Sequence, residues 1–136
     1  NDINFQLTNL KVQFQNYLDK QELDKEITKA KVLLMSSVNL DSVNNIIPGK
    51  LFYYFSAQRP IIAFSNLNSD VSKIIELTNT GSVFDYSNKI DLKNHILELY
   101  NDFKSNKNNF KPKEITNYTF EVLSKNLDQI LHKTIS

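Results

Sequence analysis

The chain has 136 residues, of which 40% are hydrophobic and 23% are charged, and its formal net charge is +1. These values are typical of one folded domain, and they argue against a disordered chain and against a strongly basic nucleic-acid binder. The chain has no cysteine, which excludes disulfides, thiol catalysis and thiolate metal sites.

No apolar run reaches membrane-spanning length and no signal peptide opens the chain. We therefore expect a cytoplasmic domain. Because the chain begins at Asn1 rather than at methionine, we also expect it to be a piece of something longer.

The first third of the chain predicts two short strands, a helix and a buried strand. Residues 3–7 and 12–14 alternate apolar and polar side chains, as strands with one buried face do. Asp19 is placed to cap a helix over residues 20–29. Residues 32–35 (VLLM) are continuously apolar, which predicts a strand buried on both faces.

The middle of the chain predicts two helices, each followed by a strand. The first helix covers residues 48–58 and leads into a doubly buried strand at residues 61–64 (IIAF). Ser69 or Asp70 is placed to cap the second helix, and we expect Gly81 to end it, because glycine is common just after a helix. A short strand at residues 82–86 follows.

The last third predicts two more helices, separated by a polar linker at residues 105–112. The helix over residues 91–104 carries an apolar stripe that includes His95, which we interpret as a packing residue. The final helix covers about residues 118–132. His132 lies in its last turn, where a cation is favourable and no ligand role is needed.

Alternating strands and helices with short connections predict an α/β fold. We expect a Rossmann-like parallel sheet with helices on both faces. Ligands of such sheets bind beyond the carboxyl ends of the strands. That rule points to residues 36–50 and 65–70, which follow the two most apolar strands.

The start of the 48–58 helix is the most specific feature of the sequence. Pro48 fits the first helical position, Gly49 leaves the backbone approachable, and Lys50 adds a positive charge to the positive end of the helix dipole. The placement of Lys50 is unfavourable for the helix, so it indicates a bound anion, such as a phosphate. The alternative is that Lys50 is an ordinary solvated side chain.

Helical spacing separates the two tyrosines of this helix. Tyr54 shares a face with Leu51 and Phe55 and is predicted to pack on the sheet. Tyr53 lies one turn after Lys50 and is predicted to line the same cleft. Gln58 ends the helix, where a left-handed residue is often needed and would cost a non-glycine about 1 kcal/mol.

Four segments in register resemble retaining glycosyltransferases of family 4. Residues 47–63 resemble their segment IPGKLFEYLAAGRPILA, and residues 69–76 with Thr80-Gly81 resemble SDVAKIIEETGAG. Residues 30–36 resemble the strand ADVLLLPS, and Val12, Phe14 and Tyr17 resemble VxFxGY. The resemblance runs from about residue 3 to residue 131.

The resemblance implies the C-terminal, donor-binding domain of a GT-B enzyme, missing the first strand, loop and helix of that domain. Pro48, Gly49 and Lys50 would border the sugar and diphosphate of a UDP- or GDP-linked donor. A C-terminal helix at about residues 117–133 would cross back toward an N-terminal domain that holds the glycan acceptor. The parent would be a bacterial transferase, for instance of surface polysaccharide synthesis, cytoplasmic or at the inner face of the plasma membrane. This piece alone would be inactive.

Three positions depart from the family pattern. Tyr53 replaces the glutamate that holds the donor ribose, Asn45 falls where the other acidic residue of the pair would stand, and Gln58 replaces a glycine. A phenol offers one oxygen where a carboxylate offers two. An alternative interpretation is a degenerate, non-catalytic domain that binds a partner.

The remaining residues add little chemistry. Asp70 is interpreted first as a helix cap and second as a contact to the donor sugar. No catalytic residue is assigned, and neither a metal nor a cofactor nor a nucleic-acid partner is expected. A receiver-like signalling domain would need clustered aspartates at strand ends, whereas the 32–35 strand ends in serines.

Overall fold

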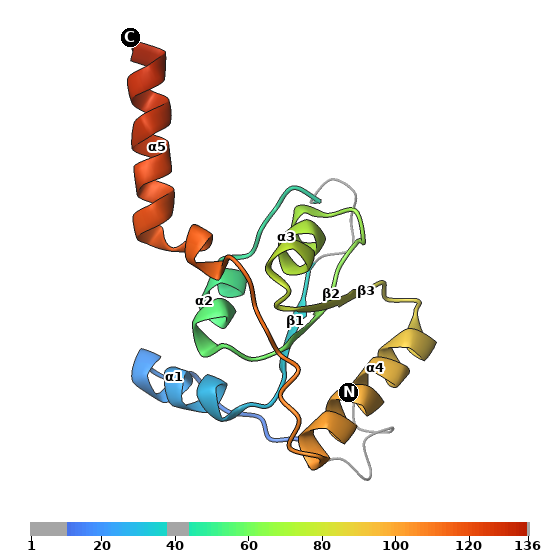
Figure 1. Cartoon of the computed structure of the whole chain (residues 1–136). Helices are drawn as coiled ribbons and strands as arrows, with labels where there is room; N and C mark the ends of the chain where they lie inside the picture. The colour runs from blue at the N-terminus through green and yellow to red at the C-terminus, as the bar shows by residue number, and fades with distance from the viewer. Residues whose placement is uncertain (1–10, 38–43, 136) are drawn as a thin grey trace.

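The computed structural model describes residues 11–37 and 44–135 (Figure 1). The strand predicted at residues 3–7 lies outside these ranges. In chain order the elements are α1 (Lys20–Lys29), β1 (Leu33–Ser36), α2 (Gly49–Ala57), β2 (Ile61–Phe64), α3 (Asp70–Thr78), β3 (Gly81–Phe84), α4 (Lys89–Lys104), a 3₁₀ helix (Ile115–Tyr118) and α5 (Phe120–Ile135).

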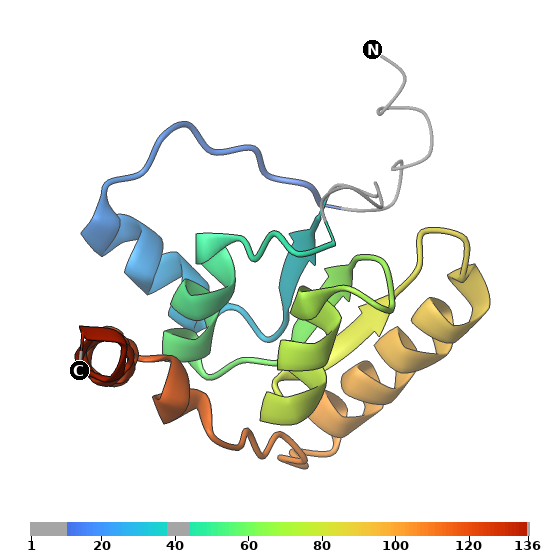
Figure 2. The ribbon, with the colours of Figure 1, turned by 90° about the horizontal axis from the view of Figure 1, so that it is seen from above.

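The three strands form a parallel sheet in the order β1-β2-β3, with Leu33 opposite Ile61 and Ile61 opposite Gly81. Helices α2 and α3 lie on one face of the sheet and α4 lies on the other (Figure 2). This arrangement confirms the predicted α/β fold with a parallel sheet and helices on both faces.

The main core lies between the sheet and the two helices α2 and α3. Alternate residues of β1 and β2 point toward these helices, as the two-residue period of a strand requires. The buried hydrophobic residues of this core are Leu33, Met35, Leu51, Phe55, Ala57, Ile61, Ala63, Val71, Ile74 and Ile75.

The opposite face of the sheet is covered less completely. Helix α4 packs on β3 through His95, whose ring lies 5.4 Å from that of Phe84, so the packing role predicted for His95 is confirmed. Leu34 on the edge strand β1 is 62% exposed. The prediction that residues 32–35 are buried on both faces is therefore wrong, because β1 lies at the edge of the sheet that the described residues form, and α4 does not cover it (Figure 2).

The strand predicted at residues 12–14 is also wrong. Residues 11–19 form neither helix nor strand, and Phe14 and Tyr17 are 84% and 97% exposed. Alternation of apolar and polar residues predicts a strand only where a neighbouring strand supplies hydrogen bonds and a core receives the apolar face.

Local chemistry explains most helix ends. Asp19 and Glu22 form the capping box that begins α1. Pro48 is the N-cap of α2 rather than its first residue, in an extended conformation with ψ 132°. Gln58 ends α2 with φ 50°, which confirms the expected left-handed residue at that position.

Gly81 does not end α3, contrary to the prediction. Asn79 ends that helix with φ 48°, as asparagine tolerates the left-handed conformation better than most residues. Gly81 is instead the first residue of β3. Within the described ranges, no helix is long and apolar enough to cross a membrane.

Candidate functional site

The two segments that the sequence singled out meet at the carboxyl edge of the sheet. The loop before α2 follows β1, and the loop before α3 follows β2. The backbone amide of Asp70 donates a 3.0 Å hydrogen bond to the carbonyl of Asn44, which joins the two loops. The first turn of α3 therefore lies beside the segment that leads into α2.

The N-terminus of α2 is open. Helices α1, α3 and α4 each have a side chain that accepts from a first-turn amide, whereas α2 has no side-chain cap and no acidic residue in its first turn. Gly49 and Lys50 are both exposed, and a Cβ added at Gly49 would meet nothing within 4 Å. An anion can therefore reach these amides and the Lys50 ammonium together. The exposure of Lys50 is equally consistent with the alternative interpretation, in which its side chain is simply solvated.

Asn45 and Asp70 flank this helix end. Asn45 is exposed in the turn that precedes α2. Asp70 is half-buried in the first turn of α3, where its carboxylate forms a 2.8 Å ion pair with Lys73. Of the two caps predicted for α3, Ser69 is confirmed, because its side chain accepts from the amide of Ser72, and the interpretation of Asp70 as the cap is wrong.

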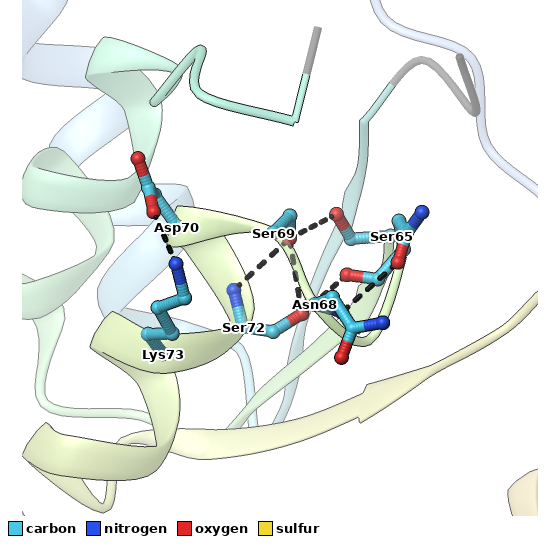
Figure 3. A network of polar contacts seen from close by, with 7 residues as sticks. Ser65, Asn68, Ser69, Asp70, Ser72 and Lys73 are labelled. Atoms are coloured by element: carbon cyan, nitrogen blue, oxygen red, sulfur yellow. Dashed lines mark hydrogen bonds and ion pairs between the residues drawn. The ribbon is translucent and has the colours of Figure 1, made fainter. Parts of the chain in front are cut away.

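A chain of buried hydroxyls holds the loop between β2 and α3 (Figure 3). The Ser69 hydroxyl lies 2.9 Å from that of Ser65 and 3.0 Å from that of Ser72, and Ser72 donates to the carbonyl of Asn66. Since Ser72 donates to a carbonyl, Ser69 must donate to Ser72 and Ser65 to Ser69. Each hydroxyl in the chain thus has a defined donor direction, which fixes the start of α3.

The carboxyl end of β1 carries another serine. Tyr86 donates a 2.5 Å hydrogen bond to the carbonyl of Ser37, and its ring stacks on Phe64. The Ser37 hydroxyl oxygen is buried and has no hydrogen-bond partner among the described residues. A buried hydroxyl of this kind can serve a bound polar group.

The Tyr53 side chain is directed at α1. Its hydroxyl donates a hydrogen bond to the Asp24 carboxylate, and this bond raises the pKa of the Tyr53 phenol above its usual value. A contact between this phenol and a donor sugar or base would require the bond to open. Nothing in the sequence marks Asp24 as the partner of Tyr53. The two residues are 29 positions apart in the chain and meet only because α1 packs on α2.

Replacing Asp24 with alanine is expected to lower the pKa of Tyr53, because the carboxylate that stabilises the protonated phenol is lost. The bond stabilises the fold at neutral pH, and that contribution disappears as the pH rises above about 10, where tyrosine ionises. The measurement is a spectrophotometric titration of wild type and Asp24→Ala, with Tyr53→Phe to assign the transition. An unchanged Tyr53 transition in Asp24→Ala would contradict the pairing.

A pocket of about 410 Å³ lies at the opposite, amino-terminal edge of the strands, against α4 and the linker that follows it. Two of its cations are engaged: Arg59 donates two hydrogen bonds to the carbonyl of Thr28, and Lys31 lies 5.4 Å from the ring centre of Phe103. This pocket is separate from the residues predicted to bind a donor.

The described residues contain no cluster of three or more histidine or acidic side chains that could hold a metal ion. Comparison with known proteins found no matching family model, curated protein or solved structure.

Proposed function

We propose that this chain is the donor-binding domain of a retaining glycosyltransferase and holds a UDP- or GDP-linked sugar at the carboxyl edge of its sheet. The observation that carries the proposal is the open N-terminus of α2, where exposed Gly49 and Lys50 follow Pro48 without a side-chain cap. The in-register resemblance of residues 47–63 and 69–81 to family 4 supports the choice of ligand.

In this proposal the diphosphate lies at the start of α2. Backbone amides of the first turn and the Lys50 ammonium stabilise the negative charge that develops as the diphosphate leaves. Gly49 allows the phosphate close to the backbone, since nothing lies within 4 Å of its missing Cβ. Asn45, in the turn before α2, and Asp70, in the first turn of α3, contact the sugar. The glycan acceptor is supplied by another domain of the parent, so this piece alone binds the donor without transferring it.

One observation favours the alternative, a degenerate domain that binds a partner. The family glutamate is replaced by Tyr53, and the hydroxyl of Tyr53 is engaged by Asp24. The phenol and the Asn45 amide each offer one acceptor oxygen, whereas a carboxylate offers two. In that case the open α2 start would be a remnant of the ancestral site.

The test is an amide-NMR titration of the chain with UDP and with GDP. We expect saturable shifts at Gly49 and Lys50 in wild type, and at least tenfold weaker binding in Lys50→Gln, because hydrogen bonds to charged groups contribute about 1.5–3 kcal/mol. Lys93→Gln is the matched control, an exposed lysine on α4, and is expected to bind as wild type does.

Absence of wild-type shifts at about 10 mM nucleotide, a very weak affinity, would overturn the donor-binding proposal. Binding that is absent from wild type but present in Tyr53→Glu would assign the degenerate interpretation. An equal loss of nucleotide affinity in Lys50→Gln and Lys93→Gln would mean that binding depends on the total positive charge of the chain rather than on the N-terminus of α2.

A further inference from the structure

The pocket of about 410 Å³ at the amino-terminal edge of the strands has a volume typical of small-molecule sites. Its walls come from segments far apart in the chain: the residues that precede β1 and β2, the start of β3, helix α4 and the linker that follows α4. A ligand in this pocket would therefore contact residues that only the folded domain brings together.

The pocket gathers more positive charge than its own carboxylates neutralise. Its basic side chains form no ion pair with a carboxylate among the residues that the structure describes. They are Lys31, Arg59, Lys107 and Lys111. The two acidic side chains of the lining have other partners. Glu98 lies 3.8 Å from the imidazole of His95, and Asp102 accepts a 2.7 Å hydrogen bond from Asn109.

The guanidinium of Arg59 is half-buried and has only neutral partners. Two of its nitrogens donate to the carbonyl of Thr28, at 3.2 and 2.8 Å. This carbonyl lies in the last turn of α1, where the helix dipole supplies about half a negative charge. The other three N–H donors of the guanidinium have no partner among the described residues. An arginine with unused donors and no counter-ion is suited to binding an anion.

Hydrogen bonds hold the linker after α4 against the body of the domain, past the end of α3 (Figure 2). The amide of Lys107 donates a 2.9 Å bond to the carbonyl of Asp102. The Asn79 side chain donates a 2.8 Å bond to the carbonyl of Lys111. The backbone is thus fixed on both sides of the pocket, while the side chains of Lys107 and Lys111 are exposed and can reach a ligand.

We propose that this pocket binds a phosphate monoester of a small organic molecule. Four basic side chains against two acidic ones leave an excess of two positive charges, and a phosphate monoester carries about two negative charges at pH 7. The phosphate lies among Arg59, Lys107 and Lys111. Leu99 and Phe110 provide an apolar wall for the organic part. Because the pocket and the α2 start lie at opposite edges of the sheet, the inference is independent of donor binding.

An amide-NMR titration of the chain with AMP, ribose 5-phosphate and inorganic phosphate tests the site. Adenosine and ribose are the controls that lack the phosphate. We expect saturable shifts at Gly81 and Lys111 with AMP or ribose 5-phosphate, weaker binding of inorganic phosphate, and no shifts with the controls up to about 10 mM.

The double variant Lys107→Gln/Lys111→Gln is expected to bind the phosphates about tenfold more weakly or worse, because charge-assisted hydrogen bonds are about twice as strong as neutral ones. Both lysines are exposed, so the fold is expected to persist, and unchanged amide signals in α2 and α3 check this. Lys89→Gln/Lys93→Gln is the matched control. It removes the same charge from exposed lysines of α4 outside the pocket and is expected to bind as wild type does.

Absence of shifts at the pocket with all three phosphates at about 10 mM would overturn the proposal. Equal binding of AMP and adenosine would also overturn it, since the phosphate would then contribute nothing. Shifts confined to Gly49 and Lys50 would place the anion at the α2 start, against this pocket and in favour of the donor site. An equal loss of affinity in the two double variants would mean that only the total charge of the chain matters, and would reject a built site.

Discussion

Replacing Gly81 with alanine is expected to lower the free energy of unfolding by about 3 kcal/mol, a large share of the stability of a small domain. A Cβ at this position would lie 1.9 Å from the carbonyl oxygen of Ile61 and 2.7 Å from its carbonyl carbon. Both atoms belong to the backbone of β2, so no side chain can rotate to make room. Strand β3 would have to move away from β2.

The chain provides its own control, since Gly49 is its only other glycine. Gly49→Ala adds the same methyl group where nothing lies within 4 Å, and alanine is the better helix former. We expect that variant to be as stable as wild type or slightly more stable. Urea unfolding measures both variants, and a Gly81→Ala cost below about 1 kcal/mol would contradict the close approach of β3 to β2.

Gly81 also illustrates what the sequence can and cannot predict. A glycine after an apolar helical pattern predicts a helix end, and the helix does end two residues earlier, at Asn79. The sequence does not show that Asn79 takes the left-handed position at the end of α3, or that Gly81 is needed instead where β3 packs against β2. That assignment depends on the distance between β2 and β3, which is a property of the assembled sheet.

The helices and the two apolar strands could be predicted because their signals are local. The capping box at Asp19, the Ser69 cap and the left-handed end at Gln58 each depend on residues within one helical turn. The exposure of Leu34 could not be predicted, because the residues of an edge strand resemble those of a central strand. Its burial depends on whether a helix covers that part of the sheet.

The candidate site was only partly predictable for the same reason. In a parallel sheet the carboxyl ends of all strands lie at one edge, so the loops that lead into α2 and α3 must meet there. The Tyr53–Asp24 bond and the direction of the serine chain through Ser69 arise from packing between elements. The sequence therefore predicts which loops meet at this edge of the sheet better than it predicts which side chains there are free of partners.

Leu51→Ala is expected to destabilise the fold by about 3 kcal/mol, within the range measured for fully buried leucines. Leu51 is 0% exposed and lies in the core that α2 and α3 form on the sheet. Truncation removes its transfer free energy and leaves a cavity beneath the first turn of α2. Because Lys50 directly precedes it, a looser first turn should also weaken any anion binding there.

Leu77→Ala is the matched control, a leucine on α3 that is 66% exposed. The chemical change and the helical context are the same, so only the burial differs, and we expect a change within about 0.5 kcal/mol. Urea unfolding of the two variants compares them directly. Similar costs for both would mean that α2 does not anchor on the sheet through Leu51, and the position of Lys50 at the carboxyl edge would then lose its structural support.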